Sequence, residues 1–119
     1  MMAGKPQRIR LYGIDCPEKG QDWGQKAKQA TADLVQDRIV QIVKKDTDRY
    51  GRIVAEIILP DGQSLNQELV KLGLAWWYIK YAPKDQTLKS LENNAREAKI
   101  GLWSTTNPVP PWQWRHQKR

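Results

Sequence analysis

The 119-residue chain is predicted to fold as one small α+β domain. Segments with the period of a β-strand alternate with segments in which apolar residues recur every three or four positions, as in a helix. Hydrophobic residues make up 39% of the chain and charged residues 28%, enough for one small core and too little for two at this length. The predicted order is strand, helix, two strands, helix, short strand, helix.

The first half of the chain contains a strand, a helix and two more strands. Residues 8–14 alternate basic or small side chains with apolar ones, the pattern of a half-buried strand. Residues 23–34 place apolar side chains at helical spacing. Residues 38–43 and 53–59 are apolar and rich in β-branched side chains, and a polar stretch separates them. We therefore expect these two runs to be strands.

The second half begins with a capping signal. Ser64, with Gln67 three residues later, fits a capping box at the start of a second helix. Residues 75–81 are aromatic and extended in character, and residues 85–99 have the clearest helical periodicity of the chain. The segment 107–115 is rich in proline and tryptophan and is expected to be extended. The predicted division is thus a folded domain over residues 1–104 and a basic tail over residues 105–119.

Composition excludes several kinds of active site. Cys16 is the only cysteine and His116 the only histidine, so an internal disulfide, a Ser-His-Asp triad and a histidine-ligated zinc site are not expected. The net charge of +7 and a pI near 9.7 suit a polyanionic partner, and nucleic acid, an anionic membrane surface and simple solubility remain open on charge alone. No apolar run approaches the roughly 18 residues that a membrane-spanning helix requires, and the N-terminus has no apolar stretch as long as that of a signal peptide. No membrane partner is therefore expected.

Arginines and carboxylates gather near predicted strand ends. Arg10 lies on the first strand, Asp15 and Glu18 follow it, and Arg52 precedes a later strand. Carboxylates suit a hard divalent cation, and guanidinium groups match phosphate oxygens. Arg10 and Asp15 would be about 17 Å apart on an extended strand, so a shared ligand requires a bend between them. The alternative is an ordinary polar turn and a solvated strand end.

Five short motifs run in order along most of the chain. They occupy residues 10–18 (RLYGIDCPE), 48–52 (DRYGR), 65–75 (LNQELVKLGLA), 80–83 (KYAP) and 98–104 (AKIGLWS). Together they resemble the staphylococcal nuclease (thermonuclease) family, over about residues 4–115. The tail over residues 107–115 also resembles the ending of many bacterial members.

This resemblance implies a fold and an activity. The fold is an OB-type β-barrel flanked by three helices. The activity is a Ca²⁺-dependent phosphodiesterase, an endonuclease that hydrolyses DNA and RNA, including single strands, and leaves 3′-phosphate ends. Members of the family are often secreted, and the chain itself shows no export signal.

The resemblance also implies roles for seven residues. These roles are phosphate binding by Arg10 and Arg52, positioning or activation of water by Glu18, calcium binding by Asp15 and by the backbone carbonyl of Cys16, and lining of the nucleotide pocket by Tyr50 and Tyr81. An exposed tyrosine ring can stack on a base.

The start of the chain departs from the family pattern. Family members begin with two further strands and a second calcium-binding aspartate, and nothing acidic precedes Asp15 here. One carboxylate is a poor site for an ion that prefers six to eight oxygens. We therefore expect a barrel truncated at its N-terminus, with an exposed sheet edge available for self-association. The alternatives are a catalytically weak nucleic-acid-binding module, or a fragment that another chain must complete.

The tryptophans admit a structural and a functional interpretation. Trp76 and Trp77 lie beside tyrosines and lysines, an arrangement that can stack single-stranded bases. Adjacent strand residues point to opposite faces, so we expect one of the two in the core and the other on the surface. Trp112 and Trp114 in the tail are expected to pack against the body, with partner binding as the alternative.

Overall fold

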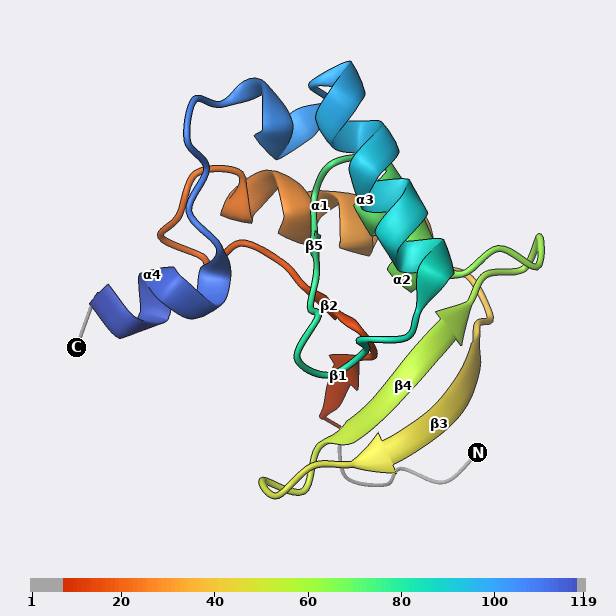
Figure 1. Cartoon of the computed structure of the whole chain (residues 1–119). Helices are drawn as coiled ribbons and strands as arrows, with labels where there is room; N and C mark the ends of the chain where they lie inside the picture. Colours follow the sequence, from red (N-terminus) through yellow and green to blue (C-terminus); the bar gives the residue numbers. More distant parts are fainter. Residues whose placement is uncertain (1–7, 118–119) are drawn as a thin grey trace.

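The structure, a computed structural model, describes residues 8–117 and confirms the α+β class (Figure 1). Its elements, in order, are β1 (Ile9–Leu11), β2 (Ile14–Asp15), α1 (Gly24–Val35), β3 (Gln41–Thr47), β4 (Ile53–Ile58), α2 (Leu65–Lys71), β5 (Trp76–Trp77), α3 (Gln86–Ala98), the 3₁₀ turn η1 (Gly101–Ser104) and α4 (Pro111–Gln117). Residues 1–7 of the predicted domain and residues 118–119 of the predicted tail lie outside the described residues.

The strands form two small sheets. In the larger sheet β4 is central, parallel to β1 and antiparallel to β3, and Arg10 is in register with Val54. In the smaller sheet β2 pairs antiparallel with β5, and Asp15 is in register with Trp76. Within residues 8–117 the hydrogen bonds between strands do not close into a barrel.

A bend replaces the continuous strand predicted over residues 8–14. The chain turns at Gly13, which has a φ of +75°, and this turn separates β1 from β2. A Cβ at Gly13 would lie 2.7 Å from Cδ1 of Leu88 and 3.2 Å from Cβ of Ala82. Glycine is therefore required here both by its backbone conformation and by close packing. The bend directs Arg10 and Asp15 toward one region of the molecule.

The buried Asn66 of α2 holds this bend. Its Oδ1 accepts the backbone N–H of Ile57 at 3.1 Å, and its Nδ2 donates to the carbonyl oxygens of Tyr12 and Ala55 at 3.0 and 3.1 Å. Ile57 lies beyond the end of β1, whose last pair is Leu11 with Ala55. The amide thus supplies the hydrogen bonds that a longer β1 would have made.

The three predicted helices are confirmed, and two of them begin at residues whose side chains cap the helix. Ser64 caps α2 by accepting the backbone N–H of Gln67, and Asp85 caps α3 by accepting that of Leu88. The main core forms where α1, α2 and α3 pack beside β4, and Leu69 and Leu88 are among its fully buried side chains. In Figure 1 these helices lie together on one side of the β3–β4 ribbon.

Strand β3 begins and ends later than the predicted 38–43. Residues 44–47 continue the strand because they pair with β4 across a register shift between Lys44 and Asp46. Within the sheet order β1-β4-β3, this strand forms an edge. Ile39, just before it, is 93% exposed, and Ile42 is 50% exposed. Self-association through this edge stays a prediction.

Both tryptophans of β5 are buried, so the prediction of one surface side chain is wrong. Trp77 packs in the main core, whereas Trp76 packs in a second cluster with Trp103 and Leu102. The two side chains point to opposite faces as expected. Each face is covered, because the end of the chain supplies the second apolar layer.

The prediction of an extended tail is wrong for its last part. Residues 111–117 form α4, a fourth helix where three were expected. Pro111 occupies its first position, where a missing N–H and a fixed φ favour a helix. Proline content therefore predicted the wrong conformation. No helix within residues 8–117 combines the length and apolarity needed to cross a lipid bilayer.

Candidate functional site: an arginine–carboxylate cleft

The predicted site residues gather along one cleft of about 580 Å³, here called the arginine–carboxylate cleft. It is lined by Ile9, Arg10, Leu11, Ile14, Asp15, Cys16, Glu18, Arg52, Tyr78, Tyr81 and Arg115. Six of the seven residues singled out from the sequence are in this set, and Tyr50 lies outside it. Tyr78 and Arg115 line the cleft without having been predicted.

Arg10 is held against two tyrosine rings. Its Cζ lies 5.2 Å from the ring centroid of Tyr78 and 5.0 Å from that of Tyr81, within the range of cation–π attraction. The two rings meet edge to face with centroids 4.8 Å apart. Tyr81 is 55% exposed. The guanidinium is therefore fixed at the wall of the cleft beside an accessible aromatic surface.

Arg52 is oriented by Asp48. Its Nε donates to Oδ2 of Asp48 at 2.7 Å, while Oδ1 accepts the backbone N–H groups of Tyr50 and Arg52, each at 2.9 Å. Burial acts to raise the pKa of Asp48, but these hydrogen bonds outweigh it and lower the pKa. The ring centroid of Tyr50 lies 5.6 Å from Cζ of Arg52, and Tyr50 is exposed. The turn 48–52 thus presents an oriented guanidinium with a tyrosine at its side.

Arg115 joins the two carboxylates of the cleft. Its Nη2 lies 2.8 Å from Oδ2 of Asp15, and its Nη1 lies 2.5 Å from Oε2 of Glu18 and 3.5 Å from Oδ1 of Asp15. Burial raises the pKa of Asp15, although the hydrogen bond and charge of Arg115 oppose that rise. The hydrogen bond with Asp15 raises the pKa of Arg115 further above its usual range. Both carboxylates therefore already have a cationic partner.

Cys16 has an unreactive thiol. Burial, with a smaller contribution from the charge of Asp15, raises its pKa to about 12. The thiolate is the reactive form of cysteine, so this side chain is chemically quiet at neutral pH. Its environment agrees with a role for the backbone carbonyl alone, and that role stays a prediction.

As arranged, the described residues do not fit a calcium ion. Residues 8–117 contain no group of three or more acidic, histidine or cysteine side chains placed to hold a metal. Asp15 and Glu18 are the acidic side chains that line the cleft, and both are ion-paired to Arg115. A calcium ion prefers six to eight oxygen ligands. The position between the two carboxylates is taken by a guanidinium.

Comparisons with known proteins agree on one family. The family model described as "Staphylococcal nuclease homologue" matches residues 8–105. An Escherichia coli protein named "Uncharacterized endonuclease" is 46% identical over 99% of this chain and 76% of its own length. A Shigella flexneri protein named "Micrococcal nuclease" is 40% identical over 94% of this chain and 70% of its own length. A staphylococcal-like nuclease of Arabidopsis thaliana is 39% identical over 99% of this chain and 36% of its own length.

Proposed function

Since this chain belongs to the staphylococcal nuclease family, we propose that it is a nuclease that hydrolyses phosphodiester bonds in the arginine–carboxylate cleft. The observation that supports this proposal most is the placement of Arg10 and Arg52 in the same cleft as Asp15 and Glu18. Nucleic acid is the substrate class, and the net charge of +7 favours its approach.

The two arginines bind the scissile phosphate. Guanidinium groups present paired donors that match phosphate oxygens, and they keep their charge at any physiological pH. Hydrolysis passes through a phosphoryl group whose oxygens gain negative charge, so donors fixed in advance lower the barrier. Arg10 is preorganised by its tyrosines and Arg52 by Asp48.

Glu18 positions the attacking water and accepts its proton. Water forms a bond to phosphorus as the 5′ P–O bond breaks, which leaves a 3′-phosphate end and a 5′-hydroxyl. General-base assistance of this kind contributes about 10²–10⁴-fold in rate. Glu18 can act in this way only when its carboxylate is released from Arg115.

The tyrosines near the two arginines bear on which nucleic acids the protein accepts as substrates. Tyr81 offers an exposed ring on which a base can stack, and Tyr50 stands beside Arg52. Stacking of this kind tolerates any sequence, which suits both DNA and RNA in single-stranded form.

We propose that β1–β5 form part of an OB-type barrel. The calcium requirement that the family implies does not fit the described carboxylate arrangement, so the roles above are assigned to the side chains alone.

Cleavage of a labelled single-stranded DNA tests the proposal. Purified protein is incubated with the oligonucleotide in calcium and in chelator, alongside Arg52→Ala and Arg38→Ala. Arg38 is the matched control, because it is exposed and its guanidinium donates to the Leu34 carbonyl near the end of α1, outside the cleft. Loss of one oxyanion-binding group costs about 10²–10³-fold, so Arg52→Ala should lose cleavage by that factor while Arg38→Ala retains it. Unchanged turnover in folded Arg52→Ala would contradict the phosphate-binding role.

A second function, nucleic-acid binding with little hydrolysis, is favoured by one observation. The carboxylate of Glu18 is ion-paired with Arg115 and so is not free to accept a proton. Salt-sensitive binding of the oligonucleotide, with no cleavage in calcium or in chelator, would support this function and contradict the nuclease proposal.

A further inference from the structure

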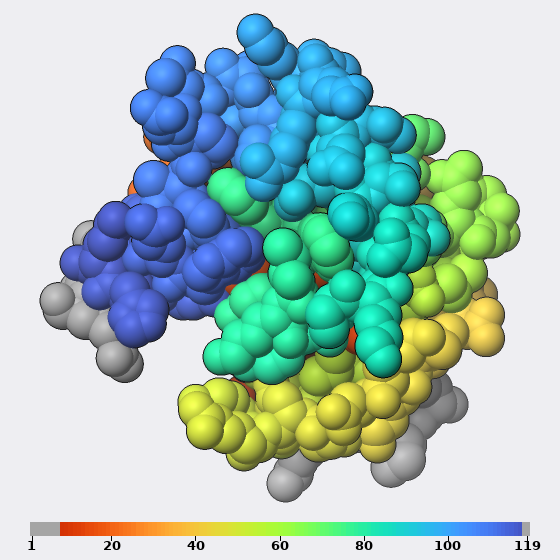
Figure 2. All heavy atoms as spheres, in the orientation of Figure 1, coloured from red at the N-terminus to blue at the C-terminus, as the bar shows by residue number. Residues whose placement is uncertain are grey.

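Helix α4 carries a tryptophan that packs against the aromatic wall of the arginine–carboxylate cleft. Trp112, the second residue of α4, stacks on Tyr78 with ring centroids 4.8 Å apart and planes 9° apart. It also meets Trp76 edge to face, with ring centroids 5.6 Å apart. In Figure 2 the blue C-terminal segment lies against the green residues around this stack. The contact comes from outside residues 8–105, the part of the chain that the family model matches.

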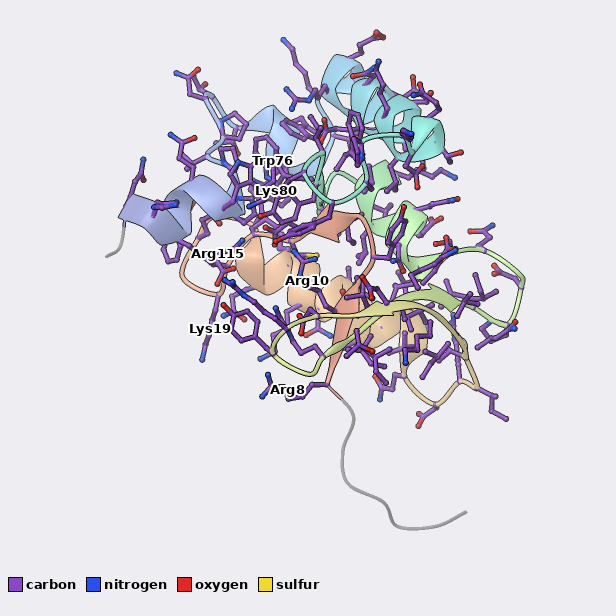
Figure 3. The ribbon with its side chains drawn as sticks, turned by 60° about the horizontal axis from the view of Figure 1, so that its bottom comes forward. Arg8, Arg10, Lys19, Trp76, Lys80 and Arg115 are labelled. Carbon is purple, nitrogen blue, oxygen red and sulfur yellow. The ribbon has the colours of Figure 1, made fainter. Side chains whose placement is uncertain are left out.

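Contacts on either side of Trp112 along the helix hold its ring in place. Pro111, the preceding residue, is fully buried. Arg115 bonds the two carboxylates that line the cleft. Residues three apart lie on the same face of a helix, so Trp112 and Arg115 both face the body of the protein. Arg115 lines the same cleft as Arg10, and Figure 3 shows both on the same side of the molecule.

Tyr78 links Trp112 to Arg10. The backbone N–H of Tyr78 donates to the carbonyl of Gly13 at 2.8 Å, which fixes the start of the side chain at the bend between β1 and β2. Its half-buried ring contacts the stacked indole of Trp112 and the ring of Tyr81, whose centroid lies 4.8 Å away. Cζ of Arg10 lies 5.2 Å from the ring centroid of Tyr78. The indole therefore supports a ring that itself supports the guanidinium.

The orientation of Arg10 depends on its aromatic neighbours. Among the described residues its guanidinium makes no hydrogen bond and no ion pair, so the cation–π contacts with Tyr78 and Tyr81 are what orient it. In contrast, Nε of Arg52 is held by Asp48 at 2.7 Å. A hydrogen bond fixes the direction of a guanidinium by itself, whereas a cation–π contact follows the position of the ring. The firmness with which the Tyr78 ring is held thus decides the firmness of Arg10.

We propose that Trp112 is a positioning residue of the active site, which fixes the ring of Tyr78 and through it the guanidinium of Arg10. The proposal rests on the proposed function for the phosphate-binding role of Arg10. Donors that are fixed in advance lower the barrier to hydrolysis, and a guanidinium that must reorient during the reaction loses part of this effect. The C-terminal helix is therefore a part of the active site as well as a segment packed on the body.

Steady-state cleavage of a labelled single-stranded oligonucleotide by the full chain tests the proposal. Trp112→Ala should lower kcat about tenfold and leave KM within about twofold, because Arg10 keeps its charge but loses its fixed orientation. Trp112→Phe keeps a ring that can stack on Tyr78, so its kcat should stay within about threefold of the unaltered chain. The matched control is Gln113→Ala, an exposed neighbour on the same helix, which should change neither constant by more than about twofold.

A double-mutant cycle separates positioning from a purely structural role. If Trp112 acts through Arg10, Trp112→Ala should cause no further loss of kcat in an Arg10→Ala background. The same tenfold loss in both backgrounds, or an unchanged kcat in folded Trp112→Ala, would overturn the positioning role. Circular dichroism establishes that each variant is folded. If Trp112→Ala does not fold, Trp112→Leu replaces it in every comparison, because leucine keeps apolar volume at this position without an aromatic ring.

A spectroscopic measurement separates this proposal from the nuclease proposal. The ring currents of Tyr78 and Tyr81 displace the Nε–H signal of Arg10 in ¹H–¹⁵N spectra, and the signal is identified by its loss in Arg10→Ala. It should move in Trp112→Ala and stay in place in Trp112→Phe. A signal that moves in this way, with no cleavage by any of the proteins, would support the positioning of Arg10 and contradict the nuclease. Cleavage by the unaltered chain, with the signal in place in folded Trp112→Ala, would do the reverse.

Discussion

Replacing Asn66 by alanine should destabilise the fold and disturb the cleft together. The Asn66 amide bonds three backbone groups, on Tyr12, Ala55 and Ile57, and its side chain is 1% exposed. Tyr12 lies in the bend between Arg10 and Asp15. The variant therefore removes the hydrogen bonds that fix the relative position of a phosphate-binding arginine and a carboxylate.

The expected loss of stability is estimated from the hydrogen bond that each of the three backbone groups loses. The N–H of Ile57 is left buried without its acceptor, at a cost of about 1–3 kcal/mol. The two donations to Tyr12 and Ala55 contribute about 0.5–1.5 kcal/mol each, and Ala55 keeps the hydrogen bond from the N–H of Tyr12. The expected loss in the free energy of unfolding is about 3 kcal/mol, a large part of the roughly 5–15 kcal/mol typical of a domain.

Urea unfolding monitored by circular dichroism measures this loss. With a slope of about 1–3 kcal/mol per molar urea, the midpoint should fall by about 1–3 M. Asn66→Asp should fall further, because it keeps the acceptor for Ile57 but turns a carboxylate toward two carbonyl oxygens. The matched control is Asn94→Ala on the exposed side of α3, which should change stability by less than about 0.5 kcal/mol. A loss below about 1 kcal/mol in Asn66→Ala would refute the reasoning.

Three further predictions address the cleft and its support. Asp48→Asn should lower the cleavage rate about tenfold, because Arg52 loses a charge-assisted partner. Steady-state kinetics at constant salt measures this change, and an unaltered rate would mean that the ion pair is dispensable. Gly13→Ala should lose more than about 1 kcal/mol in thermal unfolding, because its Cβ would meet Leu88 at positive φ; an unchanged melting temperature would mean that the bend adapts. Cys16, with a pKa of about 12, should be alkylated by iodoacetamide at pH 8 far more slowly in the native protein than in urea, since only about one thiol in 10⁴ is ionised. Equal rates would contradict its burial.

The pKa of Asp48 also sets a pH dependence. Because this pKa is lowered on folding, the stabilisation from its hydrogen bonds is present above the pKa of an unfolded aspartate. It is lost as the pH falls through the lower, folded value. Acid titration of the urea midpoint should therefore show a smaller loss in Asp48→Asn than in the unaltered chain. An identical acid-induced loss in the two proteins would count against this contribution.

Local signals in the sequence predicted most of the helical structure. Helical periodicity and a capping pair are properties of neighbouring residues, so α1 and α2 begin close to the expected positions. The sequence did not predict the bend within residues 8–14, because the alternation of side chains continues through Gly13. That bend depends on Leu88 and Asn66, which are distant in sequence. Residue type singled out Arg10, Asp15, Glu18 and Arg52, the family resemblance added Cys16 and Tyr81, and packing brings these six residues to one cleft.

The contact of Arg115 could not be predicted from the sequence. It lies 100 residues from Asp15 and 97 from Glu18, and no local pattern relates an arginine in a proline-rich tail to two carboxylates near the start. One signal was available: Trp112 and Trp114 precede Arg115 in a chain expected to fold its tail onto the body. Trp112 identifies the docking surface, but the identity of the residue that reaches the cleft depends on helix α4, which proline content argued against.

Trp76 connects the tail, the small sheet and the cleft. It is paired in register with Asp15 across β2 and β5, and its ring packs against both Trp103 and Trp112. Docking of α4 therefore covers the residue whose backbone positions Asp15, while Arg115 on the same helix bonds the Asp15 carboxylate. The same helix therefore contacts both the Asp15 carboxylate and the indole of the residue that is paired with Asp15. The burial of Trp76 thus depends on the second cluster, to which the C-terminal segment contributes Trp112, whereas the burial of Trp77 is a feature of the main core.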